Sequence, residues 1–380
     1  MMMSRASFSP RITSPRTRAL LGTLLIAGVG SHAASAQPSR ASAEMAKSLD
    51  QIVARELQRQ GIPGLQVAVG SNGRIVYSRA MGKADVENDV ALTPASLIRT
   101  GSIAKSISAV AAMTLVEAGR LNLDAPIQTY CKEFPTKPWP ITTRELLSHT
   151  SGIRHYRGNE ADNTNHYAKM SDGFAIFAND SLLFEPGTHF SYTTYGYTVV
   201  GCVIEGASGQ PYYDYVREHV LIPAGMMHTL VDNIFTIVPH RARGYHGHRD
   251  STTNAGLMDG SYKLPGGGLV STAEDLVRFG MALMSGKLLK PATLELMWTP
   301  SGAPQLDGGR PSTYGLGFDV ATVDGQKVVS HSGGQQGTTT DLVMVPGKSF
   351  AAATMANDDQ ADPTLVNRLI LDAYRMPRPR

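Results

Sequence analysis

The amino-acid sequence predicts an α+β fold, in which one antiparallel sheet is layered with helices and carries an inserted helical region. Three observations lead to this prediction. Strand-like segments joined by turn signals lie towards both ends of the chain, and a helical segment flanks each set. The long middle part instead repeats apolar residues at helical spacing. We therefore expect the two ends of the chain to build one sheet, with the helical part inserted between them.

The first 36 residues are expected to be a signal peptide rather than part of this fold. They contain four arginines and no acid, followed by a short apolar run at 19–30 and the small-residue motif Ala34-Ser35-Ala36. The apolar run is shorter than the about 20 residues that span a bilayer. The prediction is a periplasmic or secreted protein with a single domain over 37–380 and no stable membrane span. An uncleaved membrane anchor is the alternative.

Charge and composition narrow the classes of partner. Removal of the four N-terminal arginines changes the formal net charge from +3 to −1, so nothing in the mature chain favours a nucleic acid. His246-Gly247-His248 with Asp250 is the only tight group of metal-ligand types, and it lies in a sequence typical of an exposed loop. No metal and no organic cofactor are therefore expected. The sequence does not indicate an oligomeric state.

The two cysteines, Cys131 and Cys202, are expected to be buried free thiols. An exported compartment permits a disulfide, but a chain of this length buries a large core without one.

The N-terminal half begins with an amphipathic helix, whose apolar residues recur over 45–57 before Gly61. Strands are expected at 65–69 and 75–79, joined by a hairpin turn at Asn72-Gly73, because Asn-Gly tolerates positive φ at both turn positions. A further helix is expected from the Ser102 motif through the apolar run 107–117, ending near Gly119, and a short helical piece is expected at 143–148.

The second half starts with a polar stretch at 156–184, which indicates a loop or lid. Pro265 to Gly268 predicts a tight turn rather than a phosphate cradle, since the Lys and Ser/Thr of a P-loop are missing. Ser271 and Glu274 are spaced as a capping box at the head of a helix. The other helices are expected at 197–206, 212–220 and 363–374, and the strands at 314–320, 327–331, 341–345 and 350–356.

The chemistry is indicated first by Ser102 and Lys105, which lie three residues apart where the apolar helix begins. Residues i and i+3 share one face of a helix, so a hydroxyl and an amine would lie side by side at its N-terminus. A lysine can remove the serine proton only if burial or nearby positive charge lowers its pKa. The unpaired N–H groups of the helix end would favour a developing oxyanion. A capping serine beside a solvated lysine is the alternative reading of this motif.

Two later motifs strengthen the catalytic reading. Tyr192-Thr193-Thr194 precedes a helix, and His331-Ser332-Gly333-Gly334 ends a predicted strand. With Ser102-x-x-Lys105, in this order, they resemble the serine β-lactamase and penicillin-binding protein superfamily. The class C β-lactamase-like branch is the most similar. Within it, the runs 116–124 and 147–156 resemble the mitochondrial serine β-lactamase-like proteins, and the likeness extends over about 51–370.

The resemblance implies a role for each motif. Ser102 would attack a carbonyl group and become acylated, while Lys105 and Tyr192 move the proton and later activate water. Either of these two residues could be the base. The N–H groups of Ser102 and Gly334 would form the oxyanion hole. Substrate would bind Thr194, Ser332 and Gly333, with His331 included in the catalytic set, whereas His149 is expected to have a structural role.

Two departures from the family pattern affect the choice of substrate. Thr194 stands where β-lactamases of this branch have Asn, and His331 stands where they usually have Lys. The imidazole has an ordinary pKa near 6.5, so we expect it to change charge in the working pH range. The sequence therefore predicts an exported serine hydrolase acting through an acyl-enzyme on an ester, amide or peptide. The alternatives are a β-lactamase or DD-carboxypeptidase and, from another class, a non-catalytic scaffold or cell-wall-binding protein.

Overall fold

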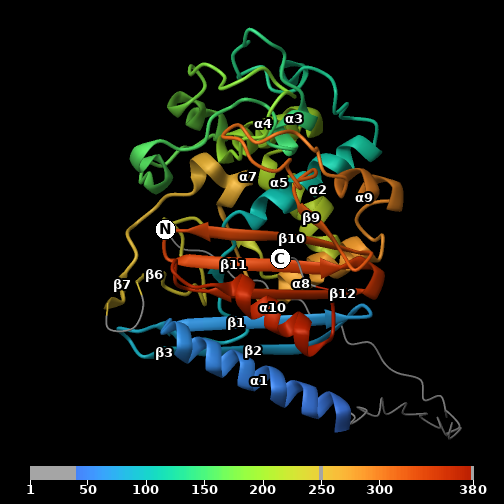
Figure 1. The fold of residues 1–380 in the computed structure, drawn as a ribbon. Coiled ribbons are helices and arrows are strands. Elements are labelled where there is room, and N and C mark those ends of the chain that lie inside the picture. The colour runs from blue at the N-terminus through green and yellow to red at the C-terminus, as the bar shows by residue number, and fades with distance from the viewer. Residues whose placement is uncertain (1–39, 248–250, 378–380) are drawn as a thin grey trace, which may run out of the picture. The chain divides into compact units, whose positions relative to one another are not determined.

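A seven-stranded antiparallel sheet organises the structure, a computed structural model that describes residues 40–247 and 251–377 (Figure 1). The strand order is β3-β2-β1-β12-β11-β10-β9. Strand β1 from the N-terminal part pairs with β12 from the C-terminal part from Leu65 to Ser71, which confirms the predicted α+β sheet built from both ends of the chain. The strands are β1 (Gly64–Ser71), β2 (Arg74–Asp85), β3 (Val90–Ala91), β9 (Asp319–Val323), β10 (Gln326–Gln335), β11 (Thr338–Val345) and β12 (Phe350–Ala356).

The two faces of the sheet are covered by different helices (Figure 1). Helices α1 (Arg40–Gln60) and α10 (Pro363–Ala373) pack on one face, where Leu49 and Val366 join a cluster with Val67 of β1. Helix α8 (Ala273–Met284) packs on the other face, in the cluster that contains Ala68. Neighbouring residues of β1 thus enter opposite cores, as the alternation of side chains along a strand requires.

The helical region is inserted between β3 and β9 and packs around α2, whose side chains are buried on nearly every side. A helix that is apolar all round belongs inside a core. The predicted loop at 156–184 contains only the short 3-10 helices η2 (Gly158–Asp162) and η3 (Met170–Ile176). The other main helices of this region are α2 (Ile103–Glu117), α3 (Thr143–Leu147), α4 (Thr194–Ser208), α5 (Tyr212–Val216), α6 (Ile222–Ala224), α7 (Leu264–Gly267) and α9 (Pro291–Met297).

Short elements complete the described fold. A small sheet pairs its strands in the order β4-β8-β5, and β6 pairs with β7. A π-helix follows α5 directly. These elements are β4 (Ile98–Arg99), β5 (Leu230–Val231), β6 (Tyr245–His246), β7 (Thr253–Asn254), β8 (Leu269–Ser271), the π-helix η4 (Arg217–Leu221) and the 3-10 helices η1 (Ile127–Thr129), η6 (Ser261–Lys263) and η7 (Pro346–Lys348).

Turn chemistry explains where prediction and structure agree. Asn72 and Gly73 both have positive φ, at 50° and 75°, and join β1 to β2 as expected. The strand expected at 314–320 was placed too early, because the chain turns first: the Gly315 N–H donates to the Phe318 carbonyl (2.8 Å), and β9 starts at Asp319.

The helix cap predicted at Ser271 was also wrong by one residue. Ser271 ends β8, where it pairs with Ile98, so its backbone is held in the small sheet. Thr272 is the N-cap of α8, and its hydroxyl accepts the Asp275 N–H (3.2 Å). Cap position is therefore set here by the preceding strand.

The prediction of two free thiols was wrong, because Cys131 and Cys202 form a disulfide with a Cα–Cα distance of 5.3 Å. Cys202 lies in α4 and Cys131 follows η1, so the bond ties the helix to a distant loop. None of the helices in the described part is long and apolar enough to cross a membrane. The expected signal peptide, with its boundary at residue 36, lies outside the described residues.

Candidate active site

Ser102 lies at the N-terminus of α2, immediately after β4 and the short connection Thr100-Gly101. Its side chain makes no capping hydrogen bond, so the hydroxyl is not used to hold the helix. Lys105 follows one turn later, and its Nζ lies 2.9 Å from Ser102 Oγ. The same Nζ donates to the carbonyl oxygen of Gly266 in α7, also at 2.9 Å. The structure thus brings the two residues of the first motif together and fixes the amine from a second element.

The electrostatic environment of Lys105 favours the neutral amine. The side chain is completely buried, and this burial lowers the pKa of Lys105 well below its ordinary value of 10.5. The positive charge of Lys263 lowers the pKa further. No carboxylate lies within ion-pair distance of Lys105 among the described residues. A neutral amine next to a hydroxyl can accept its proton.

Tyr192 lies just before α4, with its ring centroid 4.9 Å from Lys105 Nζ. Burial raises the pKa of Tyr192 above its ordinary value, the Ser102 side chain acts in the opposite direction, and the charge of Asp319 raises it. The phenol is therefore protonated at neutral pH. His149 packs beneath this ring at a centroid distance of 4.2 Å, and its Nδ1 accepts the Thr193 N–H (3.1 Å). This contact agrees with a structural role for His149, because it fixes the segment that carries Tyr192.

The backbone of β10 approaches the Ser102 segment so closely that only glycine fits on both sides. A Cβ atom added to Gly101 would lie 2.7 Å from the Gly334 nitrogen, and one added to Gly333 would lie 2.3 Å from the Thr100 carbonyl oxygen. Gly101 also has a φ of 51°, in the left-handed region. The Ser102 N–H, which precedes the first helical residue, has no intrahelical acceptor. The N–H groups of Ser102 and Gly334 therefore come from two backbone segments in contact.

A cavity of about 220 Å³ opens over Ser102. Four of the predicted site residues line it: Ser102, Tyr192, Thr194 and Gly334. The sequence analysis missed further lining residues, among them His155, Tyr156, Asp162, Lys263, Gly266 and Gln335. The glycine run at 265–268 was a usable signal, since a Cβ on Gly266 would lie 2.6 Å from Thr194 Cγ2. The sequence alone did not show that this run packs against Thr194 and contacts Lys105, because those contacts depend on the tertiary fold.

The rest of the third motif does not line this cavity. His331 is buried at 3% exposure: its Nδ1 donates to the Ser332 carbonyl (2.6 Å), and its Nε2 accepts from the Tyr314 hydroxyl (2.8 Å). Burial is the main cause that lowers the pKa of His331 to about 3. The expectation that His331 changes charge in the working pH range is therefore corrected. Ser332 is exposed outside the cavity, and Gly333 is buried against Thr100.

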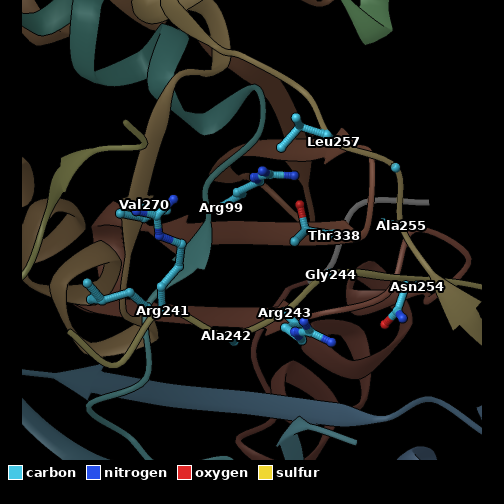
Figure 2. A pocket seen from close by; sticks show the side chains of 12 residues that line it. Arg99, Arg241, Ala242, Arg243, Gly244, Asn254, Ala255, Leu257, Val270 and Thr338 are labelled. Carbon is cyan, nitrogen blue, oxygen red and sulfur yellow. The ribbon is translucent and has the colours of Figure 1, made fainter. Parts of the chain in front are cut away.

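A neighbouring cavity of about 350 Å³ is lined by three arginines, Arg99, Arg241 and Arg243 (Figure 2). Their charges are balanced by carboxylates. Asp232 accepts from Arg99 (2.6 Å) and from Arg241 (3.1 Å), while Arg243 pairs with Asp85 (3.5 Å). The lining residues include no nucleophile with an adjacent base, so the chemistry is assigned to the cavity over Ser102.

One group of metal-ligand types occurs within the part of the chain that the structure describes: Cys131, Glu133 and Cys202. Its two sulfur atoms form the disulfide, so neither can act as a thiolate ligand. In the histidine-rich loop, His246 pairs with Asp359 at 2.8 Å, whereas His248 and Asp250 lie outside the described residues.

Comparison with known proteins places this site in a family. Residues 49–375 match the Beta-lactamase family. The human serine beta-lactamase-like protein LACTB, mitochondrial, is 29% identical over 81% of this chain and 73% of its own length. The octameric penicillin-binding protein homologue from Pyrococcus abyssi has 25% identity and a TM-score of 0.76, and the match covers 87% of this chain and 78% of that one. The D-amino acid amidase from Ochrobactrum anthropi has 26% identity and a TM-score of 0.73, over 87% and 99% of the two chains.

The matched range contains Ser102, Lys105 and all the residues that line the cavity over them. The predicted resemblance is thereby confirmed: the chain belongs to the Beta-lactamase family and is a serine hydrolase of the β-lactamase and penicillin-binding protein superfamily.

Proposed function

We propose that the protein is an exported hydrolase that forms an acyl-enzyme on Ser102 with an ester, amide or peptide substrate. One observation carries the proposal: the completely buried Lys105 places its Nζ 2.9 Å from Ser102 Oγ, with no carboxylate to keep it charged among the residues described. A serine hydroxyl needs such a neighbouring base to become a nucleophile at neutral pH.

In the first half-reaction, the neutral Lys105 accepts the Ser102 proton while Oγ bonds to the substrate carbonyl carbon. Negative charge develops on the carbonyl oxygen, which the N–H groups of Ser102 and Gly334 bind. The carbon then loses the leaving group, which takes up a proton. Because Tyr192 is a protonated phenol near both Ser102 and Lys105, it is suited to deliver that proton and to receive the lysine's in return.

In the second half-reaction, a water molecule takes the place of the leaving group. Lys105 and Tyr192 together accept one proton from this water, and the water oxygen attacks the acyl carbon. The bond from that carbon to Ser102 Oγ then breaks. Ser102 regains its proton and the acid product leaves. Of the two candidates for the base, the directions of the pKa shifts favour Lys105, since burial leaves the amine neutral and the phenol protonated.

Export is part of the proposal. Its support is the arginine-rich start, the short apolar run and the Ala34-Ser35-Ala36 motif. The disulfide between Cys131 and Cys202 adds to it, because such bonds persist mainly in oxidising compartments. Edman sequencing of the exported protein should give Gln37 as the first residue.

A substrate panel tests the proposed reaction: a neutral aryl ester, a D-amino-acid amide, a D-Ala-D-Ala peptide and nitrocefin, each with the wild type and Ser102→Ala. We expect turnover of at least the ester, lost by orders of magnitude in Ser102→Ala. Turnover mainly of nitrocefin or of the peptide would support a β-lactamase or DD-carboxypeptidase instead. Equal rates for the wild type and Ser102→Ala on every substrate would favour a non-catalytic protein.

A further inference from the structure

Lys263 is a second buried lysine, and it lies in the wall of the cavity over Ser102. It ends η6 and directly precedes α7, the short helix whose Gly266 carbonyl holds Lys105. Its side chain is only 3% exposed, and Nζ lies 5.4 Å from the ring centroid of Tyr156 and 5.3 Å from that of Tyr262. The ammonium group therefore lies over the faces of two aromatic rings.

The head group of Lys263 has few protein partners. Its Nζ donates to the carbonyl oxygen of Ala161 (2.8 Å), and this is its one side-chain hydrogen bond among residues 40–247 and 251–377. No ion pair to Lys263 occurs within the same residues. An ammonium group can donate three hydrogen bonds, and burying one without a counter-charge is costly. Because Lys263 lines the same cavity as Ser102, its remaining N–H groups can donate to a ligand bound there.

The charged groups around Lys263 leave it cationic at neutral pH. Burial and the charge of Arg99 lower the pKa of Lys263 to about 8, and Asp162 at the rim raises it. Lys105 is neutral, and burial lowers the pKa of His155 to about 4, so neither adds a cation. Lys263 is therefore protonated below about pH 8 and loses its charge above that pH.

We propose that Lys263 binds a carboxylate of the substrate beside Ser102, so that the hydrolase prefers anionic acyl compounds over neutral ones of the same shape. The inference rests on the proposed function, because it assigns the substrate class of that site. The third motif does not supply a cation here, since His331 is neutral and bound to Tyr314. Lys263 provides one from the helical region, on the wall that also carries Tyr156.

Two matched substrate pairs test the proposal with the full-length protein. Mono-4-nitrophenyl adipate and 4-nitrophenyl hexanoate differ by a carboxylate on the acyl side. The hexanoate esters of 3-hydroxybenzoate and of its methyl ester differ by a carboxylate on the leaving group. For each pair, the ratio of kcat/KM for the anionic over the neutral substrate removes any effect common to both, including a changed pKa of Lys105.

The variants are Lys263→Met, which keeps an unbranched apolar side chain, Lys263→Arg, which keeps the charge, and Lys287→Met as a control at an exposed lysine. In at least one pair, we expect Lys263→Met to lower the ratio by about tenfold, mainly through KM, since a lost charge-assisted bond is of that size. Lys263→Arg should restore most of the ratio, and Lys287→Met should leave it unchanged. In the wild type, the ratio should fall as pH rises through about 8.

Equal ratios for the wild type and Lys263→Met in both pairs would overturn the proposal, provided that a fluorophosphonate still labels Ser102. The pH dependence of the wild-type ratio decides the matter if Lys263→Met does not fold, and a ratio independent of pH would likewise contradict the proposal. A wild type that is not labelled at Ser102 would overturn the proposed function and this inference with it.

Discussion

At the scale of single residues, burial decides the charge of each titratable group in the site. Lys105 and His331 are both buried, and burial disfavours the charged form of each. The same effect raises the pKa of Tyr192. Buried groups shift by up to about 3–5 units, which is enough to make a lysine neutral at pH 7. The site thus contains a neutral amine and a neutral phenol, as proton transfer between them requires.

His331 provides the first prediction. We expect His331→Lys to lower the free energy of unfolding by about 3 kcal/mol, because it buries a lone ammonium near Lys105 and removes the acceptor for the Tyr314 hydroxyl. Urea unfolding followed by circular dichroism measures this change. His228→Lys is the control. The His228 side chain is 58% exposed, and the nearby carboxylate of Asp275 can pair with the new ammonium group.

The contrary result for His331 would be an unchanged unfolding midpoint together with a new preference of the variant for anionic substrates. It would show that the position can accept the fixed cation usual in β-lactamases.

Spacing alone predicted only the pair Ser102 and Lys105, whereas Tyr192, Thr194 and Gly334 were expected from the family resemblance. Ser102 and Lys105 are one helical turn apart, so their spacing alone implies contact. Lys263 comes from a segment more than a hundred residues away, and His155 from the loop after α3. Their approach to Ser102 depends on tertiary packing, which no local pattern in the sequence encodes.

At the scale of elements, the site is assembled from α2, the segment before α4, the loop at 155–162, α7 and the end of β10. The hairpin at Asn72-Gly73 and the long helices followed from local turn chemistry and periodicity. Errors arose where a neighbouring element set the boundary: β8 moved the cap of α8 to Thr272, and the turn at 315–318 delayed β9. Local conformation was therefore easier to predict from the sequence than the boundary between two adjoining elements.

The disulfide provides the prediction at this scale. Cys131 and Cys202 are 71 residues apart, so their bond constrains a long segment of the unfolded chain and ties down α4. We expect the double variant Cys131→Ser, Cys202→Ser to lose about 2–4 kcal/mol of stability. Urea unfolding of the wild type with and without reductant should show the same loss, while reductant should not affect the double variant.

Thiol titration of the denatured, unreduced protein checks the bond itself. These are the only two cysteines in the chain, so it should show no free thiol. Two free thiols per chain in protein recovered from an oxidising compartment would contradict the disulfide.

At the scale of the whole molecule, the site lies where the sheet meets the helical region. The sheet contributes the Gly334 amide, and the helical region contributes Ser102, Lys105, Tyr192 and Lys263. Gly101 and Gly333 permit the close approach of the two parts. The fold class was predictable because strands at both ends and helices in the middle leave few arrangements. The position of the buried Lys263 was not predictable, because it lies in the inserted region and not in any of the three motifs.

The central claim is that Ser102 is the residue that becomes acylated, and mass spectrometry of a trapped adduct tests it most directly. The protein is labelled with a fluorophosphonate and digested, and the modified residue is mapped in the wild type and in Ser102→Ala. We predict one adduct per chain, on Ser102, and none in Ser102→Ala. Ser106 and Ser151 are buried, and Ser332 is exposed outside the cavity. An adduct on any of these three serines, or labelling that persists in Ser102→Ala, would contradict the account.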